Sequence, residues 1–99
     1  MTLNAYRGEA GDFLKNADLE SSASNPAIIE MLDNEFEILK SNLENPGRLS
    51  HQIHDMMFLL FELAAVNNFN LDAEWGRGKE KKRKYSPLIT KDGHGFNRD

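Results

Sequence analysis

The sequence predicts an all-α fold, a four-helix bundle built around an antiparallel helical hairpin. Residues 50–67 form a long apolar run of helical composition, and residues 26–43 place apolar side chains at helical spacing. Between them, Glu44 to Gly47 is a turn signal short enough to make the two helices antiparallel neighbours. No segment has a convincing strand pattern.

The N-terminal segment is expected to hold a helix over residues 2–17, since apolar side chains recur there at helical spacing. Gly8 and Gly11 each weaken such a helix by about 1 kcal/mol. Residues 20–25 are polar and are expected as a loop. Asn25 before Pro26 is typical of an N-cap followed by proline in the first turn. Residues 1–22 are thus interpreted as an N-terminal helix and loop.

The predicted second helix, residues 26–43, has an apolar face and an acidic face. The apolar side chains are Ile28, Ile29, Leu32, Phe36, Leu39 and Leu43. The acidic stripe is Glu30, Asp33, Glu37 and Glu44, with Asn34 beside it. An acidic stripe of this kind is either a solvated helix face or part of a site.

The third helix is apolar nearly all round, which predicts a central, buried helix. Its polar exceptions, His51, Asp55 and Glu62, share one stripe, with Gln52 at its edge. Burying a carboxylate costs several kcal/mol, on the order of the desolvation penalty of a charge, unless a cationic group or water meets it. Asp55 therefore indicates a metal ion, a basic partner or a water-filled cleft.

The C-terminal part is expected to contain a fourth helix from Leu71 to about Lys84, followed by an extended or loosely ordered tail over residues 86–99. Ninety-nine residues make one domain. A chain of this size buries only about 60–70% of its unfolded surface. We therefore expect a homodimer or homotetramer that completes the core.

The composition excludes some kinds of site and argues against some functions. There is no cysteine, which excludes disulfides and thiolate metal sites. Neither a leader nor a membrane span is evident, so a soluble, cytoplasmic protein is expected. The net charge of −4 argues against general nucleic-acid binding. Residues 79–84, KEKKRK, are nevertheless basic, either as a solvated helix end or as a patch for nucleic acid.

The two stripes of the hairpin predict a candidate site. Polar residues three or four positions apart lie on one helix face, as Asn34 does with Glu37 and Gln52 with Asp55. If the stripes face each other, their oxygens suit Mg²⁺ or Mn²⁺. Alternatively, Asp55 pairs with a lysine or joins a buried polar network. His51 and His54 are either surface histidines or a zinc pair that needs further ligands.

Residues 31–85 resemble the MazG-like, all-α nucleoside triphosphate pyrophosphohydrolases. The first motif is MLDNEFEI and the second is QIHDMMFLLFELA, beginning at Met31 and Gln52. The segment NFNLDAEW leads into the last motif, RGKEKKRKY, which ends at Tyr85. The order and spacing of these elements fit the family well.

The resemblance implies a Mg²⁺-dependent hydrolase that cleaves a nucleoside triphosphate, standard or deoxy, to the monophosphate and pyrophosphate. Housecleaning of non-standard nucleotides is the role that this activity would serve. Glu37 and Asp55 would be catalytic. The metal ligands would be Asn34, Glu37, Gln52, Asp55 and Asp33, with Glu30 and Glu62 as auxiliary acids. Arg77, Lys81 and Lys84 would bind phosphate.

Two positions depart from the family pattern. Asn34 and Gln52 stand where the family has glutamates. Amides keep an oxygen ligand but remove two negative charges, which lowers the expected affinity for a divalent cation. The alternative is therefore a catalytically silent MazG-like module that binds a nucleotide or a protein partner.

Overall fold

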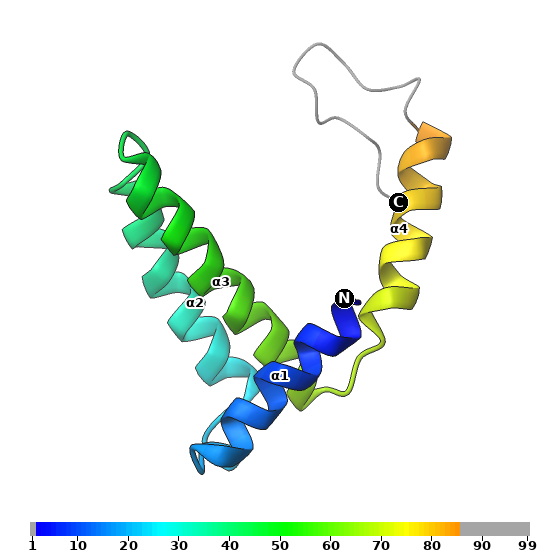
Figure 1. Ribbon diagram of the computed structural model, residues 1–99, viewed down its shortest axis with the longest axis horizontal. Helices are drawn as coiled ribbons and strands as arrows, with labels where there is room; N and C mark the ends of the chain where they lie inside the picture. The colour runs from blue at the N-terminus through cyan, green and yellow to red at the C-terminus, as the bar shows by residue number, and fades with distance from the viewer. Residues whose placement is uncertain (1, 86–99) are drawn as a thin grey trace. The chain divides into compact units, whose positions relative to one another are not determined.

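Four α-helices account for most of residues 2–85, the part of the chain that this computed structural model describes (Figure 1). They are α1 (Leu3–Asn16), α2 (Asn25–Lys40), α3 (Pro46–Val66) and α4 (Leu71–Tyr85). No strand occurs over these residues, so the predicted all-α class is confirmed. The predicted tail, residues 86–99, lies outside the described residues. The chain divides into two units, with α1 to α3 in the first and α4 in the second.

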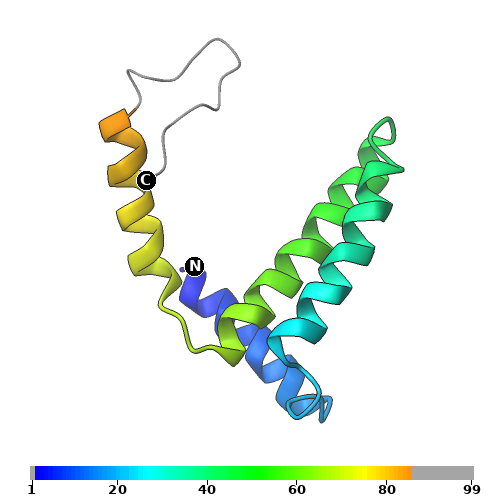
Figure 2. The same ribbon diagram turned by 180° about the vertical axis from the view of Figure 1, so that it is seen from behind.

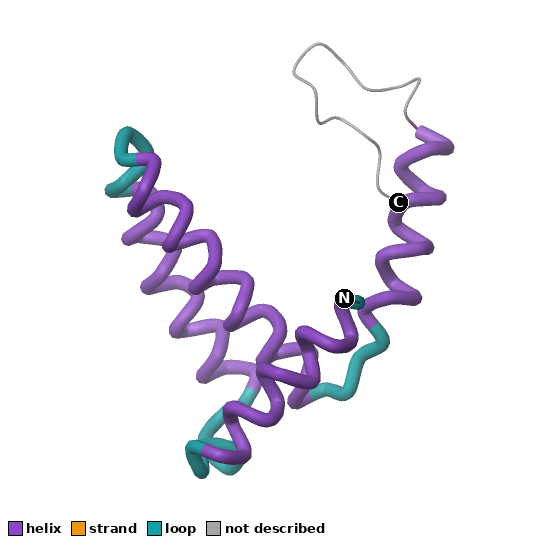
Figure 3. The backbone as a smooth tube through the Cα atoms, viewed as in Figure 1, coloured by secondary structure: helices purple, strands orange, loops and turns teal. Residues whose placement is uncertain are grey.

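The predicted antiparallel hairpin is formed by α2 and α3, which lie side by side in both views (Figures 1 and 2). The tube in Figure 3 shows the short turn that joins them. Asn45 caps α3 by accepting a hydrogen bond from the Arg48 amide at 3.1 Å. The turn is short enough to hold the two helices in direct contact along their length.

The end of α2 comes earlier than predicted, at Lys40 rather than Leu43. The Ser41 hydroxyl donates to the Glu37 carbonyl at 3.0 Å, and the Asn42 amide donates to the Ile38 carbonyl at 2.8 Å. Both carbonyls also accept a hydrogen bond from the Ser41 amide, so the two side chains add second donors to the last helical turn. The helix therefore stops while its apolar pattern continues into the turn.

The start of α2 also differs from the prediction. Ser24, not Asn25, is the N-cap, and its hydroxyl accepts a hydrogen bond from the Ala27 amide at 3.2 Å. Asn25 is the first helical residue and exchanges side-chain hydrogen bonds of 2.7 and 3.3 Å with Asn67. This pair joins the start of α2 to the end of α3. Asn68, with φ of 53°, follows the C-cap of α3 in the left-handed conformation that commonly ends a helix.

Helix α1 packs against α3 through aromatic pairs and one close approach. Tyr6 lies 5.6 Å from Phe61 and Phe13 lies 5.5 Å from Phe58, measured between ring centroids. A Cβ atom added at Gly11 would lie 3.4 Å from the Ala65 Cβ atom. These contacts place α1 along one side of α3.

The core of the first unit lies where its three helices meet. Leu14, Ala23 and Ile28 are buried, and Leu32, Leu59 and Leu63 pack against them. Helix α3 is central, as predicted, because both α1 and α2 pack on it. The expectation that it is buried all round is wrong. Its Ile53, Met57 and Leu60 side chains are about half exposed, since α1 and α2 leave part of its circumference uncovered.

Helix α4 confirms the predicted fourth helix. The Asn70 side chain accepts a hydrogen bond from the Ala73 amide at 3.0 Å, which caps its start. Asp72 and Glu74 in the first turn are favourable next to the positive end of the helix dipole. No helix within residues 2–85 is long and apolar enough to cross a bilayer.

Candidate functional site

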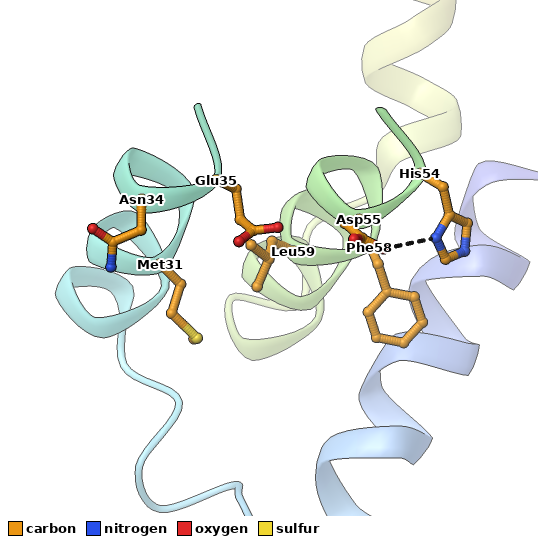
Figure 4. Close-up of a pocket in the computed structure, with 7 residues that line it drawn as sticks. All are labelled: Met31, Asn34, Glu35, His54, Asp55, Phe58 and Leu59. Carbon is orange, nitrogen blue, oxygen red and sulfur yellow. Dashed lines mark hydrogen bonds and ion pairs between the residues drawn. The ribbon is translucent and has the colours of Figure 1, made fainter. Parts of the chain in front are cut away.

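An open pocket of about 480 Å³ lies between α2 and α3, on one side of the hairpin (Figure 4). It is lined by Met31, Asn34, Glu35, His54, Asp55, Phe58 and Leu59. The antiparallel pairing of the two helices places the middle of α2 beside the middle of α3. It therefore brings together Asn34 and Asp55, one predicted residue from each motif. Glu35, which was not predicted, supplies a second carboxylate.

Asp55 has two imidazole partners. The Nε2 atom of His51 lies 3.3 Å from one carboxylate oxygen, and the Nδ1 atom of His54 lies 3.2 Å from the other. The Asp55 side chain is 35% exposed, and both histidines are exposed, as the surface interpretation predicted. When protonated, these imidazoles are the basic partners that a carboxylate on an apolar helix was expected to need. A bound cation would compete with them for the same oxygens.

Glu35 and Gln52 form a polar contact between the middle of α2 and α3. Gln52 is only 5% exposed, and its Nε2 atom donates to the Glu35 carbonyl at 3.0 Å and to Glu35 Oε1 at 2.8 Å. The other Glu35 oxygen accepts no hydrogen bond within residues 2–85. Gln52, predicted as a metal ligand, thus uses its amide nitrogen to orient a carboxylate that lines the pocket.

A signal for Glu35 was present in the sequence. It falls in helical register with Ile28, Leu32 and Leu39, the arc that packs toward α3. A glutamate on that arc faces the neighbouring helix rather than solvent. Glu35 lies outside the acidic stripe of α2, from which the candidate ligands were predicted.

The rest of the acidic stripe of α2 is exposed. Glu30, Asp33 and Glu37 do not line the pocket. Glu37, with its side chain 72% exposed, forms an ion pair of 2.8 Å with Lys40. Asn34 lines the pocket, although in Figure 4 its amide group points away from α3, whereas Glu35 points toward it. Among the predicted residues of α2, Asn34 is thus the one at the pocket.

Glu62 lies outside the pocket, in the interior of the first unit. It is 5% exposed, and burial raises the pKa of its carboxyl group above the ordinary value. Within residues 2–85, no hydrogen bond or ion pair stabilises the charged form. Glu62 therefore does not reach the pocket at which it was expected as an auxiliary acid.

The predicted phosphate-binding residues belong to α4. Arg77 forms an ion pair with Glu74, one turn earlier. Lys81 is exposed, and the side chain of Lys84 lies outside the described residues. The three positions share one face of α4, because they are separated by one and two helical turns.

The described residues contain no preassembled metal centre. Over residues 2–85, no group of three or more histidine, cysteine, aspartate or glutamate side chains is placed to hold a metal ion. The pocket instead offers two carboxylates from facing helices, Glu35 and Asp55, while the Asn34 amide points away from α3. Comparison of the chain with models of protein families, with curated proteins and with solved structures finds no match.

Proposed function

We propose that the protein binds a nucleoside triphosphate with Mg²⁺ at the pocket between α2 and α3 and hydrolyses it to the monophosphate and pyrophosphate. The observation that carries this proposal is that Asn34 and Asp55, which match positions of the two MazG-like motifs, line one pocket with Glu35. Water would add to the α-phosphorus, and the bridging oxygen would leave with pyrophosphate.

The donor set suits Mg²⁺ if the substrate supplies the remaining ligands. Mg²⁺ commonly takes one or two carboxylates from a protein and completes its shell with water and phosphate oxygens. Glu35 and Asp55 are two such carboxylates, and Gln52 holds one oxygen of Glu35 in place. The cation, Mg²⁺ or Mn²⁺, would neutralise phosphate charge and lower the pKa of the attacking water. Arg77, Lys81 and Lys84 of α4 stay the phosphate-binding residues that the resemblance implies.

The experiment measures pyrophosphate release from common and deoxynucleoside triphosphates with Mg²⁺ or Mn²⁺. We expect turnover that falls by about 100-fold or more in Asp55→Asn and Glu35→Gln, the range for loss of a charge-stabilising group. Glu37→Gln is the matched control. The resemblance implies that Glu37 is the catalytic carboxylate of α2, whereas we propose Glu35, which lines the pocket. Loss in Glu37→Gln alone would overturn the assignment of Glu35.

A second candidate is a silent nucleotide-binding module. The observation that favours it is that both oxygens of Asp55 already face imidazoles and Glu37 already pairs with Lys40. In that case nucleotides would raise the melting temperature, as any ligand of the native state does, without release of pyrophosphate. Folded protein with neither turnover nor a thermal shift for any nucleotide would contradict both candidates.

A further inference from the structure

A groove of about 510 Å³, the α1–α3 groove, lies between α1 and α3, which diverge from the place where they pack (Figures 1 and 2). Its apolar lining consists of Tyr6, Ile53, Met57, Phe58 and Phe61. Tyr6 is 42% exposed, and Ile53 and Met57 are 48% exposed each. A mainly apolar concavity of about 300–1,000 Å³ is typical of sites for small molecules. The volume and lining of the α1–α3 groove therefore match a small-molecule site.

Glu9 gives this apolar groove a negative charge. It stands between Tyr6 and Phe13 on one face of α1, because steps of three and four positions stay on one face of a helix. Tyr6 packs on Phe61 and Phe13 packs on Phe58, so this face of α1 is turned toward α3. Among the described residues, the Glu9 carboxylate has no hydrogen-bond or ion-pair partner, and no lysine or arginine lines the groove. A ligand would therefore meet an unpaired carboxylate.

Aromatic rings and the surrounding charge also favour a cation over an anion. The face of an aromatic ring attracts an ammonium group within about 6 Å of the ring centroid. Tyr6 precedes Glu9 by about one turn of α1, and its ring centroid lies 5.6 Å from that of Phe61. Residues 1–69 contain eleven aspartate and glutamate side chains against four lysine and arginine side chains. The field of this part of the chain therefore attracts cations.

The groove is longer than its charged end. Ile53, Met57 and Phe61 are four positions apart and form an apolar strip along α3. Ser50 lines the far end, and α3 rises by roughly 16 Å from Ser50 to Phe61. Methionine adapts its flexible side chain to different apolar shapes. The α1–α3 groove therefore suits an elongated apolar body with a cationic group at the end near Glu9.

We propose that the α1–α3 groove binds a protonated organic amine with an elongated apolar body. The ammonium group pairs with Glu9, and the apolar body lies along Met57 and Ile53. An anion of the same shape is repelled by the carboxylate, and a neutral molecule gains the apolar contacts alone. The site uses neither Glu35 nor Asp55, so the proposal is independent of the proposed hydrolysis.

The test compares three probes that share a phenylbutyl body and differ in charge. They are phenylbutylamine, which is protonated at neutral pH, the neutral phenylpentanamide and the anion phenylpentanoate. The Met57 methyl signal of the full chain, followed by NMR, reports binding of each probe. We expect the amine to bind with a dissociation constant of about 1 mM or below, as is usual for a ligand of this size. The amide should bind about threefold to tenfold more weakly, and the anion more weakly still.

Substitutions on α1 test the charge. Glu9→Gln should weaken binding of the amine by about twofold to fivefold, the range for an exposed ion pair, and leave binding of the amide unchanged. Asp12→Asn is the matched control, because Asp12 is an exposed carboxylate one turn later on α1 and does not line the groove. It should leave the affinity for all three probes unchanged. A preference for the amine over the anion that is as large in Glu9→Gln as in the wild type would overturn the proposal.

Two further substitutions locate the bound amine. Met57→Lys should abolish its binding, whereas Leu60→Lys should not, since Leu60 is on the same helix but does not line the groove. Circular dichroism confirms that both variants are helical, and the Ile53 methyl signals report binding in them. Because Phe58 lines both the groove and the hairpin pocket, Glu35→Gln is a third control and should leave the affinity for the amine unchanged. Loss of binding in Glu35→Gln would place the amine in the pocket and overturn the proposal. Equal affinity for amine and anion, or no binding of any probe, would also overturn it.

Discussion

Glu62 lies on α3 between side chains that contact α1 and side chains that pack on the core. Phe58 and Ala65, on one side of it, contact α1, and Leu59 and Leu63, on the other, pack on the core. Burial raises the pKa of the Glu62 carboxyl group because the charged form loses its hydration. The folded protein therefore holds this proton more tightly than the unfolded chain does.

Glu62→Gln should increase the free energy of unfolding at neutral pH. The wild-type carboxyl group is ionised there in the unfolded chain, and burying that charge costs stability. The free-energy difference between variant and wild type should shrink as pH falls through the raised pKa, and level off below the ordinary value of 4.5. Urea denaturation at several pH values measures it. Glu30→Gln, on an exposed glutamate, is the control and should change the free energy of unfolding at neutral pH by less than about 0.5 kcal/mol. A stabilising effect of Glu62→Gln that grows on acidification would contradict this account.

Gln52 is the buried amide that joins the two hairpin helices. Gln52→Ala removes both of its hydrogen bonds to Glu35 and should lower the free energy of unfolding by about 1–3 kcal/mol. His51→Ala, on the exposed neighbour, is the control and should change it by less than about 0.5 kcal/mol. Equal effects of the two substitutions in urea denaturation would mean that the Gln52–Glu35 contact contributes nothing to stability.

At the scale of helices, the contact between α1 and α3 depends on which glycine is substituted. Gly11 faces Ala65, whereas nothing lies within 4 Å of a Cβ atom added at Gly8. Gly8→Leu should stabilise the protein by about 0.5–1 kcal/mol, because glycine is a poor helix former. Gly11→Leu should destabilise it by about 1–3 kcal/mol, because the added side chain forces the helices apart. Thermal melting of both variants checks this, and a stabilising Gly11→Leu would contradict the packing of α1 on α3.

The existence of the four helices was predictable, and their ends were less so. Apolar periodicity extends from Ile28 to Leu43, but α2 stops at Lys40 because Ser41 and Asn42 bond back to its carbonyls. Serine and asparagine side chains offer several alternative backbone partners, and the sequence does not rank them. The N-cap at Ser24 rather than Asn25 has the same origin.

One carboxylate of the candidate site, Asp55, was predictable from the sequence, and the other, Glu35, was not. Asp55 stood out because it interrupts an apolar helix, and it lies at the pocket. Glu35 did not stand out, since a glutamate within a strongly acidic helix carries no local signal of burial. Its role depends on which arc of α2 faces α3, and that depends on the rotation of one helix against another. Glu37 and Asn34 match motif positions, yet Glu37 does not line the pocket and the Asn34 amide points away from α3. The position of a residue in a motif does not by itself specify where its side chain points.

At the scale of the whole molecule, an apolar pattern does not say whose surface covers it. Helix α3 is apolar nearly all round, yet α1 and α2 cover only part of it. The same apolar positions would be expected whether the remaining side meets this chain or another copy. One sequence therefore predicts the number of helices. It does not predict which surfaces pack together to bury their apolar faces.

A homodimer, the smallest assembly expected from the sequence, makes thermal stability depend on protein concentration. If two folded chains dissociate on unfolding, mass action favours the folded dimer as concentration rises. A tenfold increase should raise the melting temperature by about 3–5 °C for two chains of this length. Differential scanning calorimetry over two decades of concentration measures the slope. Since the slope reports association and not helix content, a constant melting temperature in the wild type would mean that the hairpin is stable without a second copy.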